Sequence, residues 1–153
     1  MHRQIKILHM KKLTTMLFLL IGMTINAQEY VITQNELPHN AQSFIKKHFS
    51  KYTLDYVILD KEFFSSDDYT VRFSEGIKIE FDEKGDWTEI DGNYTEIPTE
   101  FISKNILSYV KTKFINTKIV KIEKGIFGSQ EVKLSNGLEL EFDSQGNFRR
   151  VDD

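Results

Sequence analysis

The sequence predicts an α+β fold built as a tandem duplication, in which a helix followed by a four-stranded antiparallel sheet occurs twice and the helices pack on one face of the sheet. Three observations support this prediction. Two segments of the chain resemble each other at a fixed offset. Each half opens with the apolar spacing of an amphipathic helix, and the remainder alternates apolar and polar residues as strands do.

The duplication is clearest where residues 76–92 (GIKIEFDEKGDWTEIDG) align with residues 137–153 (GLELEFDSQGNFRRVDD) at an offset of 61. Six of these 17 positions are identical, whereas average composition predicts roughly one match by chance. We therefore expect one domain at residues 28–153, made of two repeats at about 37–92 and 97–153.

The first 27 residues have the order of a signal peptide. Four cations precede an uncharged apolar run from Leu13 to Ile25, and the small residue Ala27 follows before the first acid. The run holds about 13 residues, fewer than the roughly 20 of a membrane-spanning helix. We therefore expect cleavage near Ala27 or Gln28, no membrane span afterwards, and a periplasmic or secreted protein. Met10 is an alternative start, and an N-terminal helix that stays on the domain is the alternative reading.

Each repeat is expected to begin with a helix. The Leu-Pro pair at 37–38 corresponds to the Ile-Pro pair at 97–98, and proline suits a first helical turn because its missing N–H costs no hydrogen bond there. Apolar residues then recur at helical spacing, which predicts helices near residues 40–50 and 99–115.

Alternation predicts the strands that follow each helix. Residues 69–74 and 77–81 alternate apolar side chains with polar or charged ones, so one face is apolar and the other charged. Residues 132–134 and 138–142 repeat this pattern, and the pair Asn136–Gly137 between them favours a hairpin turn. The earlier strands are expected around residues 56–62 and 119–123.

The last turn of each repeat has a specific signature. Residues 82–85 and 143–146 begin with an aspartate and end with a glycine, which predicts a type I turn closed by a left-handed glycine bulge. This register places Trp87 opposite Phe81, and the corresponding phenylalanines Phe148 and Phe142 opposite each other, on the buried face.

Composition excludes several classes of site and partner. The chain has no cysteine, so it forms no disulfide and offers no thiolate ligand. Removal of residues 1–27 leaves 16 Lys and Arg against 23 Asp and Glu, a net charge of −7. An acidic surface binds nucleic acid and anionic lipid poorly, so we expect no nucleic-acid partner.

The mature sequence has no motif that predicts an enzyme, a cofactor or a metal site. Only His39 and His48 remain as histidines, so a zinc site would depend on carboxylates. The acids Asp82, Glu83 and Asp86 keep calcium open as an alternative, although their spacing differs from a calcium-binding loop. Nothing would separate the pKa values of Asp82 and Asp86 as a catalytic pair, and no GxSxG motif is present. We expect no catalytic residues.

Aromatic and apolar residues in loops are the remaining candidates for a partner-binding site. Phe63 and Phe64 end a strand before a polar stretch, and Ile126 and Phe127 lie between two glycines at the equivalent place in the second half. Tyr94 lies in the polar linker between the halves. Such residues can anchor a protein partner, or they can fold back over the end of the sheet.

The order of these features resembles a known family. A helix opened by Leu-Pro or Ile-Pro, strands, a glycine hairpin, and the strings EFDEKGDW (80–87) and EFDSQGNF (141–148) are similar to the PepSY-like proteins, also described as β-lactamase-inhibitor-like. The resemblance covers about residues 30–153. It implies a small secreted or periplasmic domain whose sheet face is a protein-binding surface.

We therefore predict a non-enzymatic, inhibitor-like binding module that holds a protein or peptide partner in the cell envelope. The polar sheet face and the loops at Phe64 and Phe127 are the expected contacts. The alternative is a small-molecule or calcium-responsive envelope binding protein, which the paired acidic turns favour.

Overall fold

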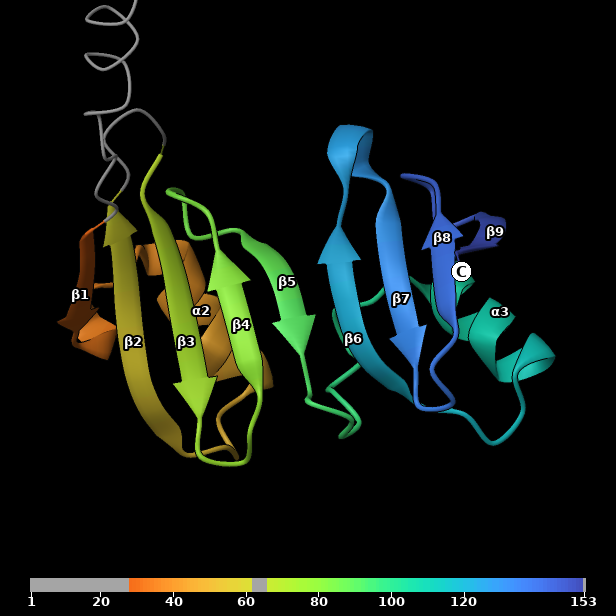
Figure 1. Ribbon diagram of the computed structural model, residues 1–153, viewed down its shortest axis with the longest axis horizontal. Helices are drawn as coiled ribbons and strands as arrows, with labels where there is room; N and C mark the ends of the chain where they lie inside the picture. The colour runs from red at the N-terminus through yellow and green to blue at the C-terminus, as the bar shows by residue number, and fades with distance from the viewer. Residues whose placement is uncertain (1–27, 62–65, 153) are drawn as a thin grey trace, which may run out of the picture.

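All strands in the described residues of the protein belong to a single antiparallel sheet. The computed structural model describes residues 28–61 and 66–152, so the predicted signal peptide and its cleavage site lie outside the described residues. Within these ranges the sheet has nine strands, and each strand pairs with the next one along the chain. Figure 1 shows α2 and α3 on one side of this sheet, while no helix of the described residues lies over the other side. We call these sides the covered face and the uncovered face.

The elements follow one another with short connections. The strands are β1 (Gln28–Ile32), β2 (Leu54–Lys61), β3 (Asp68–Phe73), β4 (Lys78–Phe81), β5 (Trp87–Asp91), β6 (Ile119–Lys124), β7 (Gln130–Leu134), β8 (Glu139–Phe142) and β9 (Phe148–Asp152). The helices are α2 (His39–His48) and α3 (Lys104–Lys113), with short 3₁₀ turns η1 (Gln34–Glu36) and η2 (Ile126–Gly128). Neither α-helix, nor any other helix in the described ranges, has the length and apolar character needed to cross a membrane.

The predicted fold class is wrong. Instead of a duplicated helix with its own four-stranded sheet, one nine-stranded sheet runs through the described chain, and strands outnumber helices. β5 pairs with β6 in the middle of the sheet, with Ile90 opposite Ile122, and β1 adds a strand along β2. Both pairings provide hydrogen-bond partners for backbone N–H and C=O groups that would otherwise be unpaired at a strand edge. The alternation within a strand does not report which edge it pairs with. The division into two repeats stays a prediction.

The helices occupy the predicted regions, but α3 starts later than predicted. Ser103 is its N-cap, and the Ser103 Oγ accepts a hydrogen bond of 3.4 Å from the backbone N–H of Ile106. The helix therefore begins at Lys104, and Pro98 lies outside it. In α2, by contrast, Pro38 is the N-cap and directly precedes the first helical residue, instead of lying inside the first turn.

The core lies between the covered face and the two helices. Ala41 and Ile45 of α2, and Ile106 and Val110 of α3, are buried against apolar strand residues. Phe81 and Phe142 are fully buried, as the alternation predicted. No polar or charged residue is buried in the described part of the chain, so the covered face is wholly apolar at its centre. The strand residues that form this centre are Val57, Val71, Ile79, Phe81, Ile90, Ile122, Val132, Leu140 and Phe142.

The predicted glycine-bulge turns are confirmed. Gly85 has a φ of +78°, and its N–H donates a 2.9 Å hydrogen bond to the carbonyl of Asp82. The register shifts next to this turn and places Phe81 opposite Trp87, and Phe142 likewise lies opposite Phe148. These turns therefore fix which side chains of β4, β5, β8 and β9 face the helices.

Each of these glycines also packs against the start of a helix. A Cβ atom at Gly85 would lie 2.8 Å from the backbone nitrogen of Ala41. A Cβ atom at Gly146 would lie 2.6 Å from the Oγ of Ser103. Both the positive φ and the close approach therefore require glycine at these positions.

Candidate functional site: the uncovered face of the sheet

A row of glutamates crosses the uncovered face. Each of its members alternates with buried apolar residues of its strand, as Glu80 does between Ile79 and Phe81. Pairing across five neighbouring strands places these residues side by side, and Arg150 of β9 ends the row. We call this set the glutamate row: Glu80, Glu89, Glu123, Glu131 and Glu141.

A second row beside it carries both signs of charge. Its register runs from β3 to β9, and its lysines reach toward the glutamate row. We call this set the mixed row: Arg72, Lys78, Asp91, Lys121, Lys133, Glu139 and Asp152.

Two lysines neutralise the first part of the glutamate row. The Lys78 Nζ pairs with Glu80 at 2.7 Å and also with Glu89. The Lys121 Nζ pairs with Glu89 at 2.8 Å and with Glu123 at 3.0 Å. Glu89 is the centre of this network, and its side chain is only 13% exposed.

The pKa values of this network follow from that arrangement. Burial alone would raise the pKa of Glu89, but the hydrogen bonds and charges of Lys121 and Lys78 outweigh it, so the pKa lies below its ordinary value. Burial would likewise lower the pKa of Lys121, but its bonds to Glu89 and Glu123 raise it. Glu89 and Lys121 are therefore ionised at neutral pH.

The far end of the row is balanced less completely. Arg150 pairs with Glu141 at 2.7 Å and with Asp152 at 3.4 Å, and Lys133 pairs with Glu139 at 2.5 Å. Within the described ranges, the carboxylate of Glu131 takes part in no ion pair or hydrogen bond. Burial, and then the charges of Glu139, Glu123 and Asp152, raise the pKa of Glu131.

A hollow of about 200 Å³ opens at this end of the row, beside the β6–β7 hairpin. Four carboxylates and one guanidinium line it together with the apolar side chain of Ile126. Its charged lining residues are Glu123, Glu131, Glu141, Arg150 and Asp152.

The tip of the β6–β7 hairpin presents two apolar side chains to solvent. Ile126 is 80% exposed and Phe127 is 96% exposed, so neither folds back over the end of the sheet. Phe127 has a φ of +57°, a backbone conformation that residues other than glycine rarely adopt. The tip is closed by a 2.9 Å hydrogen bond from the N–H of Gly125 to the carbonyl of Ser129.

The other predicted contact residues do not gather at this tip. Tyr94 is exposed and follows β5, which runs antiparallel to β6, so it lies at the opposite end of the strands from η2. Phe63 and Phe64 lie outside the described residues. The structure therefore brings Ile126 and Phe127 together with the glutamate row, but not with Tyr94.

Sequence reasoning missed the glutamate row as a unit. The signal was present, because each of these glutamates occupies a polar position of an alternating strand. The pairing of β5 with β6 was not predicted, and without it Glu89 and Glu123 would not be neighbours.

The first aspartate of each acidic turn accepts hydrogen bonds from backbone N–H groups of the same turn. The Asp82 Oδ1 accepts hydrogen bonds of 2.9 Å from the backbone N–H groups of Lys84 and Asp86. In the second turn the side chain and backbone N–H of Asn147 donate to Asp143 and lower its pKa. Across the described ranges no three or more His, Asp or Glu side chains are arranged so that together they could hold a metal ion.

His39 and His48 lie at the two ends of α2. His39 is exposed at the start of α2. The ring of His48 lies 4.9 Å from that of Phe44 and 5.4 Å from that of Phe101, so it is a half-buried member of an aromatic cluster. Burial, and then the charge of Lys47, lower its pKa.

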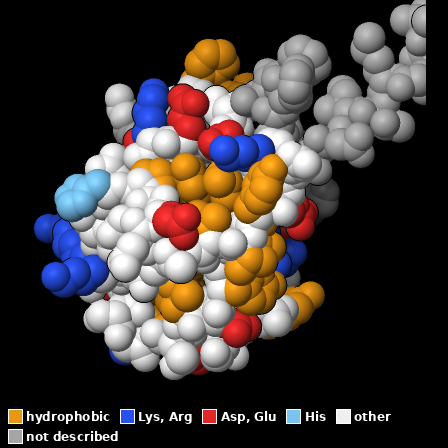
Figure 2. Space-filling view, turned by 90° about the vertical axis from the view of Figure 1, so that its left-hand side faces the viewer, with side chains coloured by type: hydrophobic (Ala, Val, Ile, Leu, Met, Phe, Trp, Pro, Cys, Tyr) orange, Lys and Arg blue, Asp and Glu red, His pale blue; other side chains and the backbone are white. Residues whose placement is uncertain are grey.

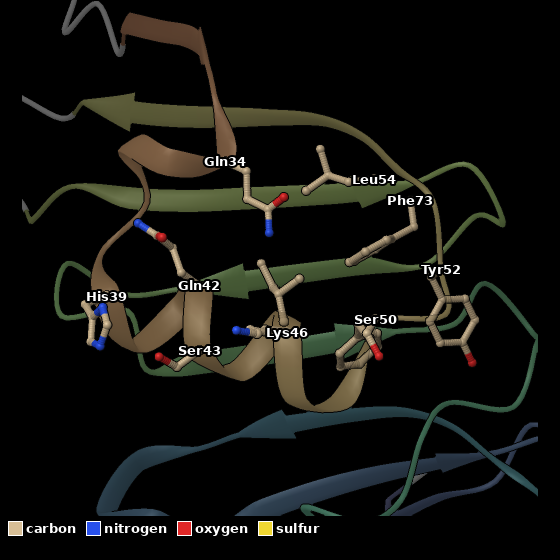
Figure 3. Close-up of a pocket in the computed structure, with 11 residues that line it drawn as sticks. Gln34, His39, Gln42, Ser43, Lys46, Ser50, Tyr52, Leu54 and Phe73 are labelled. Carbon is tan, nitrogen blue, oxygen red and sulfur yellow. The ribbon is translucent and has the colours of Figure 1, made fainter.

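A larger hollow of about 490 Å³ lies beside α2. Figure 2 shows hydrophobic side chains gathered at this end of the molecule, and Figure 3 shows the residues around the hollow. Phe49, Ile45 and Phe73 form buried parts of its wall, while polar side chains such as Gln42 and Lys46 surround them.

Comparisons with solved structures identify similar proteins. A protein described as a "putative calcium-regulated periplasmic protein" from Bacteroides thetaiotaomicron is 38% identical, with a TM-score of 0.77 over 82% of this chain and 97% of that one. Two proteins from Bacteroides vulgatus, each described as a "putative periplasmic protein", are 38% and 37% identical, with TM-scores of 0.75 and 0.76. Each comparison covers 82% of this chain, and 98% and 100% of the two B. vulgatus chains. No curated protein matches the chain.

These relatives support a periplasmic location, because all three are described as periplasmic proteins. A family model described as "Putative beta-lactamase-inhibitor-like, PepSY-like" matches residues 67–150, which is more than half of the chain. The chain therefore belongs to the PepSY-like family, as its EFD-glycine-aromatic strings predicted.

Proposed function

We propose that this protein is a non-enzymatic periplasmic binding module that holds a protein or peptide partner on the uncovered face, next to the β6–β7 hairpin. The observation that carries the proposal is the 96% exposure of Phe127 at the tip of that hairpin, beside a charged surface that neither α2 nor α3 covers. Large apolar side chains held in exposed positions next to polar surface are typical of protein-binding anchors.

The geometry of the tip supports this role. Ile126 and Phe127 are held by a closed hairpin between two glycines. A backbone that is already held in one conformation loses little conformational entropy on binding, so more of the burial of its side chains contributes to affinity. The neighbouring charges would then set the orientation of the partner and the rate of association.

A capture experiment tests the proposal. Wild-type protein and the double variant Ile126→Ser, Phe127→Ser would be used as baits in an envelope extract from the source cells, and recovered proteins identified by mass spectrometry. Ile115→Ser is the matched control, because Ile115 is 74% exposed but lies after α3, away from the hairpin.

We expect a specific partner to be recovered with wild type and with the control, and to be lost with the hairpin variant. Equal recovery of the partner with all three baits would show that the hairpin does not bind it.

Calcium response is the second candidate, because the relative from B. thetaiotaomicron is described as calcium-regulated and the acidic turns occur in both halves of this chain. Against it, the Asp82 and Asp143 carboxylates already accept backbone hydrogen bonds. Thermal melts with calcium and with chelator separate the two candidates. A ligand that binds only the folded state raises the midpoint, so a rise in millimolar calcium would favour this candidate.

A further inference from the structure

Charge along the glutamate row is neutralised unevenly. Lys78 and Lys121 hold Glu80, Glu89 and Glu123 in ion pairs, whereas Glu131 has no such partner among the described residues. Glu131 is half-buried between Glu123 and Glu141, the residues opposite it on the two neighbouring strands. Like charges directly opposite each other across strands repel. An added positive charge would therefore be stabilised most at Glu131.

That place is also a hollow with an apolar wall. The opening of about 200 Å³ is lined by Glu131 and three other carboxylates, and Arg150 is its one basic residue. Ile126 forms the side nearest the hairpin, and Phe127 follows it at the tip. An acidic floor beside an apolar wall complements a segment that carries a cationic and an apolar side chain together.

We infer that the partner presents a basic segment, whose lysine or arginine side chain enters the hollow at Glu131 while a neighbouring apolar side chain packs on Ile126 and Phe127. This inference rests on the proposed function, and it names the chemistry of the partner. The net charge of −7 that remains without residues 1–27 favours the same sign of partner over long range.

The energetic reason is local. A half-buried carboxylate that faces other carboxylates is costly to ionise, and an incoming cation removes that cost while it forms charge-assisted hydrogen bonds. The raised pKa of Glu131, caused first by burial and then by Glu139, Glu123 and Asp152, agrees with this picture. The charge of Lys121 lowers the pKa of Glu131, but the Lys121 amine is already bonded to Glu89 and Glu123.

A pair of labelled peptides tests the inference. In one short peptide lysine alternates with Phe, Leu and Val, and the other has glutamate in place of each lysine. Fluorescence anisotropy would measure their affinity for wild type, Glu131→Gln and the control Glu100→Gln. Glu100 is exposed near His48 on the covered side, so its loss changes net charge equally without touching the hollow.

We expect the lysine peptide to bind at least about tenfold more tightly than the glutamate peptide, and more weakly as salt is added. Glu131→Gln should weaken binding of the lysine peptide by about three- to tenfold, while Glu100→Gln leaves it close to wild type. Equal affinity for the two peptides, or equal effects of the two variants, would overturn the inference.

The same variants separate this inference from the proposed function. If capture of the envelope partner is lost with the Ile126 and Phe127 variant but is unchanged by Glu131→Gln, the binding module stands and the basic segment is wrong. If capture survives the hairpin variant, the proposed function itself fails. If millimolar calcium stabilises wild type but not Glu131→Gln, the hollow holds a cation instead of a partner side chain, and the inference is overturned.

Discussion

The two faces of the sheet differ in what their side chains do. On the covered face, Val71, Ile79 and Phe142 are fully buried against the helices, and no polar side chain is buried among the described residues. On the uncovered face, alternate residues of the same strands carry charges in rows, in which the side chain of Glu89 is 13% exposed and Glu131 lacks an ion pair within the described ranges. The same backbone thus supports a packed core on one side and a charged surface on the other.

This difference separates stability from recognition. Apolar burial dominates the free energy of folding, while exposed ion pairs contribute little. Substitutions on the covered face should therefore unfold the protein, and substitutions on the uncovered face should change binding with small effects on stability. Substitutions at four positions test where this separation holds and where it fails: Phe142, Gly85, Glu89 and His48.

The largest effect is expected at the centre of the covered face. Phe142→Ala should lower the free energy of unfolding by about 3–5 kcal/mol, because it removes a fully buried ring and leaves a cavity next to Tyr109 and Phe148. Urea denaturation measures it. Lys133→Ala on the uncovered face of the neighbouring strand is the control, and we expect it to cost much less because exposed ion pairs contribute little to stability. Similar losses for both variants would contradict the separation.

A smaller loss is expected where the turn meets α2. Gly85→Ala forces a side chain into a φ of +78° and places its Cβ 2.8 Å from the backbone nitrogen of Ala41. We expect a loss of about 1–3 kcal/mol in urea denaturation. Gly137→Ala is a matched control, because Gly137 also has a positive φ but nothing lies within 4 Å of its Cβ position. If the two variants lose the same stability, the close packing on the helix contributes nothing.

Glu89 is the place where the separation should partly fail. Glu89→Ala leaves Lys78 and Lys121 without their shared partner in a partly buried site, so we expect a loss of roughly 1–2 kcal/mol. Glu141→Ala on the same row should cost less, because its partner Arg150 remains more exposed and keeps Asp152. Equal stability of wild type and Glu89→Ala would show that this network is dispensable for folding.

The smallest effect is a pH dependence from His48. Its pKa is lowered in the folded state by burial first, so the unfolded chain binds the proton more readily. Stability should therefore decline as pH falls through the ordinary histidine range near 6.5 toward the lower folded value. Melting curves of wild type and His48→Gln between pH 5 and 8 would measure this, with the variant expected to show a shallower slope over roughly that range. A steeper slope in the variant would contradict the assignment.

Local patterns in the sequence predicted local geometry well. The aspartate and glycine of each last turn determined the bulge and the register of Phe81 with Trp87, because turn chemistry acts over a few residues. Apolar alternation likewise predicted the burial of Phe81 and Phe142. The start of α3 was placed wrongly, since the serine cap at Ser103 was overlooked in favour of Pro98.

Long-range pairing could not be predicted in the same way. The alternation of β5 and β6 is satisfied equally in two separate sheets or in one, so the pairing of Ile90 with Ile122 had no local signature. The glutamate row depends on that pairing, which is why its members were not recognised as one surface. The sequence allows Phe127 either to point into solvent or to fold back over the end of the sheet. The closed hairpin of the structure distinguishes these alternatives, because it leaves Phe127 exposed.

The most direct test of the account is site-specific photocrosslinking in living cells of the source organism. A photoreactive phenylalanine analogue would replace Phe127 at the hairpin of the uncovered side or Ile115 after α3, both of which are exposed positions. We predict a discrete crosslinked partner from position 127 and none from position 115. A partner trapped from position 115 alone would contradict the assignment of recognition to the uncovered face.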